Sequence, residues 1–148
     1  MNPEKRLITG FGFGLLFVLA FAIFLLFTFK TVVVSGPSME PTLPNGKKVL
    51  VSSAYWLVGD IRDKDIVVIS ENHPRNPSGY IIKRVYALGG EKVNWRNVPD
   101  SWPLANGEYV VPKGEIYVLG DNREYSEDSR KFGSIPGSRI LGKVIVRP

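Results

Sequence analysis

The chain has 148 residues, a formal net charge of +5 and no cysteine. The lack of cysteine excludes disulfide bonds, a thiol nucleophile and cysteine-based zinc sites. Beyond residue 30, basic residues exceed acidic ones only slightly and form no basic block, so a nucleic-acid-binding surface is not expected.

The single histidine, His73, lies in a stretch rich in Asn and Pro, between Asn72 and Pro77. Such a stretch is typical of a polar surface loop. We therefore expect His73 to be a surface residue, and any hydrolytic chemistry to proceed without histidine. Neither a metal nor another cofactor is expected.

The N-terminal part of the chain contains an uncharged apolar run of 23 residues, Leu7–Phe29. As a helix it would be about 34 Å long, which is enough to cross a hydrocarbon layer of about 30 Å. A cleaved signal peptide is the alternative. However, the apolar region of a signal peptide has only about 7–15 residues and is followed by a small-residue cleavage site, and no such site is found here. The run therefore predicts a single retained transmembrane helix.

Basic residues flank this run unequally. Lys5 and Arg6 precede it, and Lys30 is the basic residue close behind it. Because basic residues favour the cytoplasmic side, the N-terminus is expected in the cytoplasm. The chain is thus divided into an anchor, residues 1–30, and one domain outside the membrane, residues 31–148.

The stretch Ser35–Leu43 follows the anchor closely and contains Ser38 between Pro37 and Pro41. Two prolines exclude a regular helix or a central strand, and a stiff loop can hold a hydroxyl at a fixed angle. A linker is the alternative interpretation of this stretch. Ser38 lies eight residues after Lys30, so it must act within about 28 Å of the membrane boundary.

The rest of the chain is rich in short β-prone runs separated by turn residues, and no long helix is expected after residue 30. The apolar segment Tyr55–Val58 is interpreted as core, with the lipid interface as the alternative. The chain is expected to be mainly β, with antiparallel sheets or a partly open barrel. Strands are predicted at residues 31–34, 48–52, 65–69, 80–88, 108–111, 116–119 and 140–146. Loops are predicted at 71–79 and 91–107, with one short strand in the second as an alternative.

Lys83 occupies an unusual place in the predicted strand 80–88. Strand alternation puts it on the same face as Ile81, Val85 and Ala87. Such a lysine either extends to solvent or is desolvated, and desolvation lowers its pKa toward the range of a general base.

The segment 120–130 is too polar for a core element, since it combines turn residues, hydroxyls and charges of both signs. It is either a solvated loop or a buried polar network.

Together these stretches resemble the type I signal peptidases, which are membrane-bound endopeptidases with a Ser/Lys dyad. Ser38-Met39-x-Pro41-Thr42-Leu43 is similar to the nucleophile motif of that family, and Lys83-Arg84-Val85 to its general-base motif. Asp65-Ile66-Val67-Val68 is similar to the strand motif between them. Gly120-Asp121-Asn122-x-x-x-Ser126-x-Asp128-Ser129-Arg130 matches the last motif at its fixed positions.

The resemblance implies an all-β catalytic domain that removes signal peptides from exported preproteins. It implies that Ser38 is the nucleophile, that Lys83 is the general base and that Ser126 orients the lysine amine. It also implies small residues at the −1 and −3 positions of the substrate.

Four further residues are implied to support the site. Asp128 and Arg130 would form an ion pair, and Gly36 and Met39 lie on either side of the nucleophile. Some members of the family have a serine at the position of Gly36 whose hydroxyl binds the oxyanion together with the backbone N–H of the nucleophile. Here a backbone or water donor, or Ser35, would have to replace it.

The expected partners are signal peptides and the lipid bilayer, and the expected location is a bacterial cytoplasmic membrane, with a mitochondrial inner or thylakoid membrane as the alternative. Two other functions are less consistent with the sequence. A non-catalytic peptide-binding relative would not need both Ser38 and Lys83. A soluble self-cleaving Ser/Lys protease would not need the apolar run Leu7–Phe29.

Overall fold

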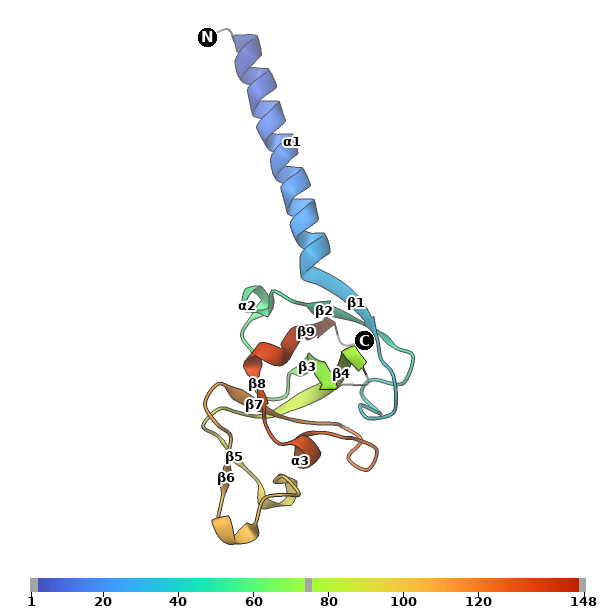
Figure 1. Ribbon diagram of the computed structural model, residues 1–148. Helices are drawn as coiled ribbons and strands as arrows, with labels where there is room; N and C mark the ends of the chain where they lie inside the picture. Colours follow the sequence, from blue (N-terminus) through green and yellow to red (C-terminus); the bar gives the residue numbers. More distant parts are fainter. Residues whose placement is uncertain (1–2, 74–75, 147–148) are drawn as a thin grey trace.

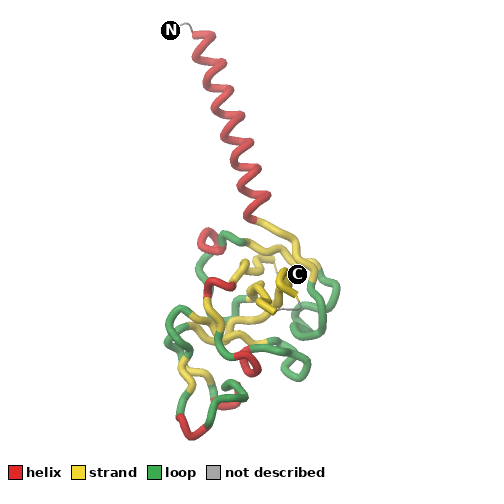
Figure 2. Tube along the Cα trace, viewed as in Figure 1, coloured by secondary structure: helices red, strands yellow, loops and turns green. Residues whose placement is uncertain are grey.

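The structure, a computed structural model, describes residues 3–73 and 76–146. Figure 1 shows a long helix, α1 (Pro3–Thr28), that extends away from a domain composed mostly of strands. The other α-helices of the described residues, α2 (Tyr55–Val58) and α3 (Ser129–Phe132), have four residues each and are among the short red segments within the domain in Figure 2. Within the described residues, the prediction that no long helix follows residue 30 is confirmed.

Seven strands form one sheet in the order β1-β2-β9-β3-β4-β7-β8, and every pair in it is antiparallel. In that order the strands are β1 (Phe29–Val33), β2 (Lys48–Ser52), β9 (Ile140–Val146), β3 (Ile66–His73), β4 (Asn76–Leu88), β7 (Glu115–Leu119) and β8 (Ile135–Pro136). A small second sheet pairs β5 (Lys92–Val93) with β6 (Tyr109–Val110). Single turns of 3-10 helix lie at Trp95–Asn97, Leu104–Asn106 and Gly137–Arg139. The expected mainly β fold of antiparallel sheets is confirmed.

The central strand β3 is buried on both faces. Ile66 and Val68 belong to one hydrophobic core cluster, whereas Val67 and Ile69 belong to another on the opposite face. A strand covered on both sides needs apolar residues at consecutive positions rather than alternate ones, which explains the continuous β-branched run of β3. Each such side chain stabilises the fold by about 1.5–3 kcal/mol.

Residues 71–79 were expected to form a loop, and this prediction is wrong. The β3–β4 hairpin continues through most of this segment, with Glu71 opposite Gly79 and His73 opposite Asn76. The turn-forming residues are tolerated because Pro77, which has no N–H, lies where β4 pairs with β3 alone. The side chain of His73 is outside the described residues.

Strand β4 has different neighbours along its length. Its pairing with β7 begins at Arg84 and ends at Leu88, whereas its pairing with β3 extends back to Asn76. Among the described residues, no strand pairs with the outer edge of β4 before Arg84. Lys83 is the last residue of this unpaired edge.

Helix α1 carries apolar side chains that are exposed from Phe13 to Phe27. Among the residues that the structure describes, no helix is both long enough and apolar enough to cross a membrane. The expected span Leu7–Phe29 is therefore not confirmed, and Phe29 is the first residue of β1 rather than part of the helix.

The segment Tyr55–Val58 was interpreted as core, and this interpretation is wrong for Leu57. Leu57 is 51% exposed in α2, and Tyr55 is only partly buried. The core at this point is formed instead by the preceding residue, Ala54, which is buried. The side chain of Trp56 is outside the described residues.

Candidate active site

Ser38 lies in the loop between β1 and β2, and the loop is attached to the core by two of its side chains. Met39 and Leu43 are fully buried in the cluster that also contains Ile66 and Val68. The N–H of Leu43 donates to the carbonyl of Met39 over 2.8 Å. Because both side chains of this turn are buried, the backbone beside Ser38 is fixed against the sheet.

The structure brings Ser38 and Lys83 together. The Nζ atom of Lys83 lies 2.9 Å from the Oγ atom of Ser38, although the two residues are 45 positions apart. Lys83 lies on β4 opposite Val67 of β3, and it is only 4% exposed. The lysine is thus desolvated and does not extend to solvent. Of the two alternatives that the sequence left open for Lys83, the structure shows the desolvated one.

Burial lowers the pKa of Lys83, and the negative charges of Asp128, Glu127 and Glu71 oppose this effect only in part. An amine with a lowered pKa is neutral over more of the physiological pH range, and a neutral amine can accept the proton of a hydroxyl. The Ser38–Lys83 pair therefore has the geometry and the electrostatics of a nucleophile with its base.

The apolar surroundings of Lys83 differ in one residue from the prediction. Ile81 and Val85 pack in the core cluster of Val67, on the face predicted for Lys83. Ala87 belongs to a separate cluster, because the register of β4 with β7 shifts between Val85 and Ala87. This irregularity breaks the strict alternation on which the prediction was based.

Asp128 is fully buried and lies at the start of α3. Its carboxylate accepts hydrogen bonds from Nε of Arg130 at 2.8 Å and from the N–H of Gly120 at 3.0 Å. Burial alone would raise the pKa of Asp128, but these hydrogen bonds outweigh it and lower the pKa below its ordinary value. Asp128 is therefore ionised, and its negative charge is neutralised mainly by Arg130. Because Asp128 is paired with Arg130, the lowered pKa of Lys83 is kept.

Ser126 is buried beside the backbone of Ser38. A Cβ atom on Gly120 would collide with the Ser126 hydroxyl and would lie 2.6 Å from the carbonyl oxygen of Ser38. The Ser126 hydroxyl makes no well-formed hydrogen bond among the described residues, but it interacts with the Asp128 carboxylate and helps to lower the pKa of Asp128. A hydroxyl held in this way can also bind the lysine amine or a substrate group.

Gly36 precedes Ser38 by two residues and has a φ of +86°. Its N–H donates to Oδ1 of Asn45 over 3.0 Å. Other residues rarely adopt this backbone conformation, which gives a structural reason for glycine at this position.

A contact between Arg84 and Asp121 was not predicted from the sequence. Nε of Arg84 donates to Oδ1 of Asp121 at 2.7 Å, and a second guanidinium nitrogen donates to Oδ2 at 2.6 Å. The hydrogen bond to Asp121 raises the pKa of Arg84. The pair joins the strand of Lys83 to the segment 120–130, so this segment is a partly buried polar network and not a solvated loop.

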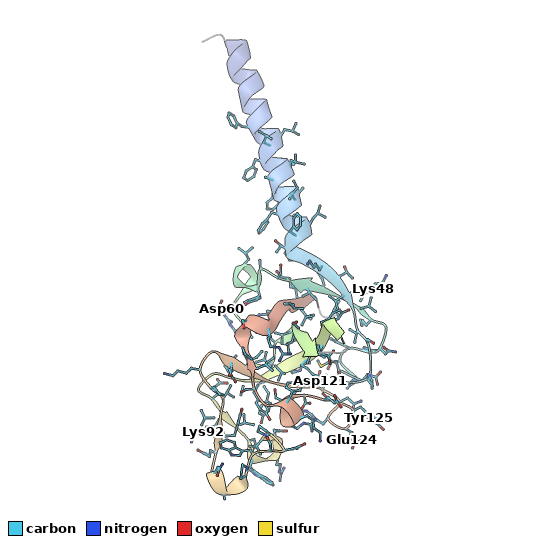
Figure 3. All side chains as sticks on the ribbon, in the orientation of Figure 1. Lys48, Asp60, Lys92, Asp121, Glu124 and Tyr125 are labelled. Carbon is cyan, nitrogen blue, oxygen red and sulfur yellow. The ribbon has the colours of Figure 1, made fainter. Side chains whose placement is uncertain are left out.

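A cleft of about 620 Å³ opens beside Ser38 and Lys83. Its walls are the segment 34–39 and β4 from Tyr80 to Lys83, together with Tyr125 and Phe132. Figure 3 shows Asp121 near the middle of the domain and Tyr125 nearer its edge. A larger cleft, of about 1210 Å³, is lined by residues of β4, β5 and β6 and contains neither Ser38 nor Lys83.

The unpaired edge of β4 forms one wall of the smaller cleft. An exposed strand edge offers backbone N–H and C=O groups to an extended peptide. The arrangement can therefore bind a peptide backbone next to Ser38.

The chain matches the family described as "Signal peptidase, peptidase S26" over residues 7–99 and 96–147. It is 32% identical over 149 residues to signal peptidase IB of Staphylococcus aureus (strain COL), covering 77% of this chain and 74% of that protein. It is 37% identical over 118 residues to mitochondrial inner membrane protease subunit 1 of Xenopus tropicalis, covering 80% of this chain and 68% of that protein. A crystal structure of a signal peptidase I from Enterococcus faecalis V583 has 25% identity and a TM-score of 0.45, covering 59% of this chain and 98% of that one.

Proposed function

The chain belongs to the signal peptidase family S26, and we propose that it hydrolyses signal peptides with a catalytic dyad of Ser38 and Lys83. The observation that carries this proposal is the 2.9 Å hydrogen bond between Nζ of Lys83 and Oγ of Ser38, with the lysine almost fully buried. A serine hydroxyl is a weak nucleophile until a base removes its proton. Lys83 is within reach of that proton.

In the first step, the Oγ atom of Ser38 attacks the carbonyl carbon of the scissile peptide bond while neutral Lys83 takes the hydroxyl proton. The resulting oxyanion is stabilised by the backbone N–H of Ser38. Lys83 then donates its proton to the leaving amine, so that the C–N bond breaks and an acyl-Ser38 ester remains. In the second step, Lys83 takes a proton from water, the resulting hydroxide attacks the ester, and Ser38 recovers its proton.

The supporting residues act through Lys83 and the loop of Ser38. We propose that Ser126 orients the amine of Lys83 once substrate is bound, since its buried hydroxyl makes no well-formed hydrogen bond among the described residues. Because Asp128 forms an ion pair with Arg130, its negative charge is partly neutralised and raises the pKa of Lys83 less than an unpaired carboxylate would. Met39 anchors the nucleophile loop in the core.

We further propose that residues 1–30 contain a membrane anchor formed by the helical part of the apolar run Leu7–Phe29, with the catalytic domain, residues 31–148, outside. The apolar side chains exposed along α1 and the basic pair Lys5 and Arg6 before the apolar run support this arrangement. The proposed location is a bacterial cytoplasmic membrane. A mitochondrial inner membrane is the alternative, because one relative is described as a protease subunit of that membrane.

The activity is tested with the purified full chain in detergent and a preprotein that carries a signal peptide. Wild type is expected to release one product, and N-terminal sequencing of that product identifies the cleaved bond. Ser38→Ala and Lys83→Ala are each expected to abolish cleavage while the circular dichroism spectrum remains native. Cleavage at the wild-type rate by either variant would exclude the dyad.

The anchor is tested separately, by alkaline carbonate extraction of membranes from cells that express the full chain. An integral protein stays in the pellet, and release into the supernatant would contradict the anchor. Protease added to intact spheroplasts is expected to digest the domain 31–148, and its protection would contradict the orientation.

A further inference from the structure

The loop that carries Ser38 is closed at its base by backbone hydrogen bonds. The N–H of Val34 donates to the carbonyl of Lys47 at 2.8 Å, and the N–H of Gly46 donates to the carbonyl of Val34 at 2.9 Å. These contacts fix the chain on both sides of the loop. They do not by themselves fix the residues between Val34 and Ser38.

A side chain supplies the next contact toward Ser38. Asn45 lies at the turn before Gly46, and its Oδ1 atom accepts the N–H of Gly36 at 3.0 Å. Pro37 follows and has no N–H to donate. Asn45 therefore makes the last hydrogen bond to a backbone N–H before Ser38 that the structure describes.

Ser38 is held from its other side by a backbone contact. Its carbonyl oxygen accepts the N–H of Asn122 at 3.0 Å. The nucleophile thus lies between two fixed points, the Asn45–Gly36 hydrogen bond and the Asn122–Ser38 hydrogen bond. Only Gly36 and Pro37 separate the first point from Ser38.

Gly36 is the weak point of this short connection. Glycine loses more conformational freedom on folding than any other residue, and the φ of +86° at Gly36 is one of many that it can adopt. A Cβ at Gly36 would meet no atom within 4 Å, so packing around it does not select this conformation. The hydrogen bond that the N–H of Gly36 donates to Asn45 favours the observed conformation.

We propose that Asn45 is a positioning residue that keeps Ser38 within reach of Lys83 by holding the N–H of Gly36. This inference rests on the proposed role of Ser38 as nucleophile. Asn45 does not touch the reacting atoms, and its effect passes through the backbone of Gly36 and Pro37. One consequence concerns the oxyanion: while the Gly36 N–H is bonded to Asn45, it is not the second oxyanion donor.

The chain provides a matched control for this proposal. Its other Asn-Gly pair is Asn106-Gly107, where Gly107 also has a positive φ, of +78°. Asn106 lies between β5 and β6, and its backbone N–H bonds to Pro103. Asn106→Ala therefore makes the same change at a similar turn without touching the loop of Ser38.

The test compares Asn45→Ala, Asn45→Asp and Asn106→Ala with wild type in the full chain. The values of kcat and KM for a signal-peptide substrate are measured on the pH plateau, and the melting temperature is measured alongside. Working on the plateau removes any effect of the new aspartate charge on the protonation of Lys83. If Asn45→Ala does not fold, Asn45→Gly replaces it, because glycine keeps the turn and has no acceptor.

Asn45→Ala is expected to lower kcat about tenfold with KM within about twofold of wild type, since small displacements of a reacting group cost up to about 100-fold in rate. Asn45→Asp keeps an acceptor oxygen and is expected to retain most of the wild-type kcat. Asn106→Ala is expected to match wild type in both constants.

Wild-type kcat in Asn45→Ala would overturn the proposal. So would a loss of kcat that Asn45→Asp does not restore, or one that Asn106→Ala shares. Failure of the proposed function gives a different result: wild type would not cleave the substrate, or Ser38→Ala would cleave it equally well.

Discussion

Arg84 and Asp121 form a bidentate salt bridge directly beside the proposed catalytic base, with guanidinium-to-carboxylate distances of 2.7 and 2.6 Å. Arg84 follows Lys83 on β4, and Asp121 is the second residue after β7. Arg84 also donates to the carbonyl of Lys64 at 2.8 Å. The pair therefore fastens the segment 120–130, with Ser126 and Asp128, to the strand that carries Lys83.

Removing one partner of this pair should weaken both the fold and the activity. Asp121→Asn leaves the partly buried Arg84 without its countercharge, and a hydrogen bond to a charged group contributes about 1.5–3 kcal/mol. We expect the free energy of unfolding to fall by about 2 kcal/mol, and kcat to fall because Ser126 and Asp128 shift. Urea unfolding and cleavage kinetics measure the two effects. Wild-type values of both would show that the pair does not fasten the segment.

The pH dependence of cleavage should report the protonation of Lys83. Because its pKa is lowered, kcat/KM is expected to be high at neutral pH and to fall as the pH drops through this pKa, where the amine becomes protonated and can no longer accept a proton. Glu127→Gln removes a charge that raises the pKa of Lys83, so the acidic limb should move to lower pH, most clearly at low salt. A limb that stays in place, or moves to higher pH, would contradict this assignment.

Replacing Lys83 by methionine should separate stability from activity. Because the folded-state pKa of Lys83 is depressed, the unfolded chain binds more protons between the folded and unfolded pKa values, and stability rises with pH over that window. Lys83→Met removes this penalty and fills the same space, so its melting temperature at neutral pH should equal or exceed that of wild type, with cleavage abolished. A large loss of melting temperature would show that Lys83 is needed for folding.

Asp128 should contribute stability that depends on its charge. Its pKa is lowered in the folded state, so the contribution is present above the unfolded pKa of about 3.9 and is lost as the pH falls through the folded value. Asp128→Asn keeps the shape, leaves Arg130 unpaired, and should cost about 3 kcal/mol at neutral pH. The difference in melting temperature between the variant and wild type should shrink as the pH falls below about 4. A difference that does not change with pH would contradict the ionised state of Asp128.

The glycine at position 120 should be required for activity. A Cβ at Gly120 would collide with the Ser126 hydroxyl and with the carbonyl oxygen of Ser38, so Gly120→Ala must displace one of them. We expect kcat to fall at least tenfold, since small displacements of a nucleophile are costly. Gly14→Ala is the control, because a Cβ there meets no atom within 4 Å. Equal kinetics of Gly120→Ala and Gly14→Ala would contradict the close packing at Gly120.

Much of this arrangement could be predicted from the sequence, because strands leave a local signal. The β-branched run of β3 indicated a strand buried on both faces, and such a strand is found. The alternation around Lys83 left a desolvated and a solvent-exposed lysine as alternatives, and the side chain is buried. The prediction of a loop at residues 71–79 was wrong, because turn-forming residues are also tolerated at a strand edge that pairs on one side only.

The contacts between distant residues could not be predicted from local patterns. Arg84 and Asp121 are 37 residues apart, and each is unremarkable among its neighbours in the sequence. The hydrogen bond from Gly36 to Asn45 was equally hidden, because an Asn-Gly pair indicates a turn and not what its side chain binds. Both contacts depend on the three-dimensional path of the chain.

The proposed mechanism depends most on Lys83 being a neutral base, and the pKa of Lys83 can be measured directly. Lysines labelled with carbon-13 at Cε are titrated by NMR in the full chain, and Lys83→Arg identifies the signal of Lys83. We expect Lys83 to titrate below the usual lysine value of about 10.4, at the same pH as the acidic limb of kcat/KM. A Lys83 signal that titrates together with the surface lysines, in a preparation that cleaves preprotein at neutral pH, would contradict it.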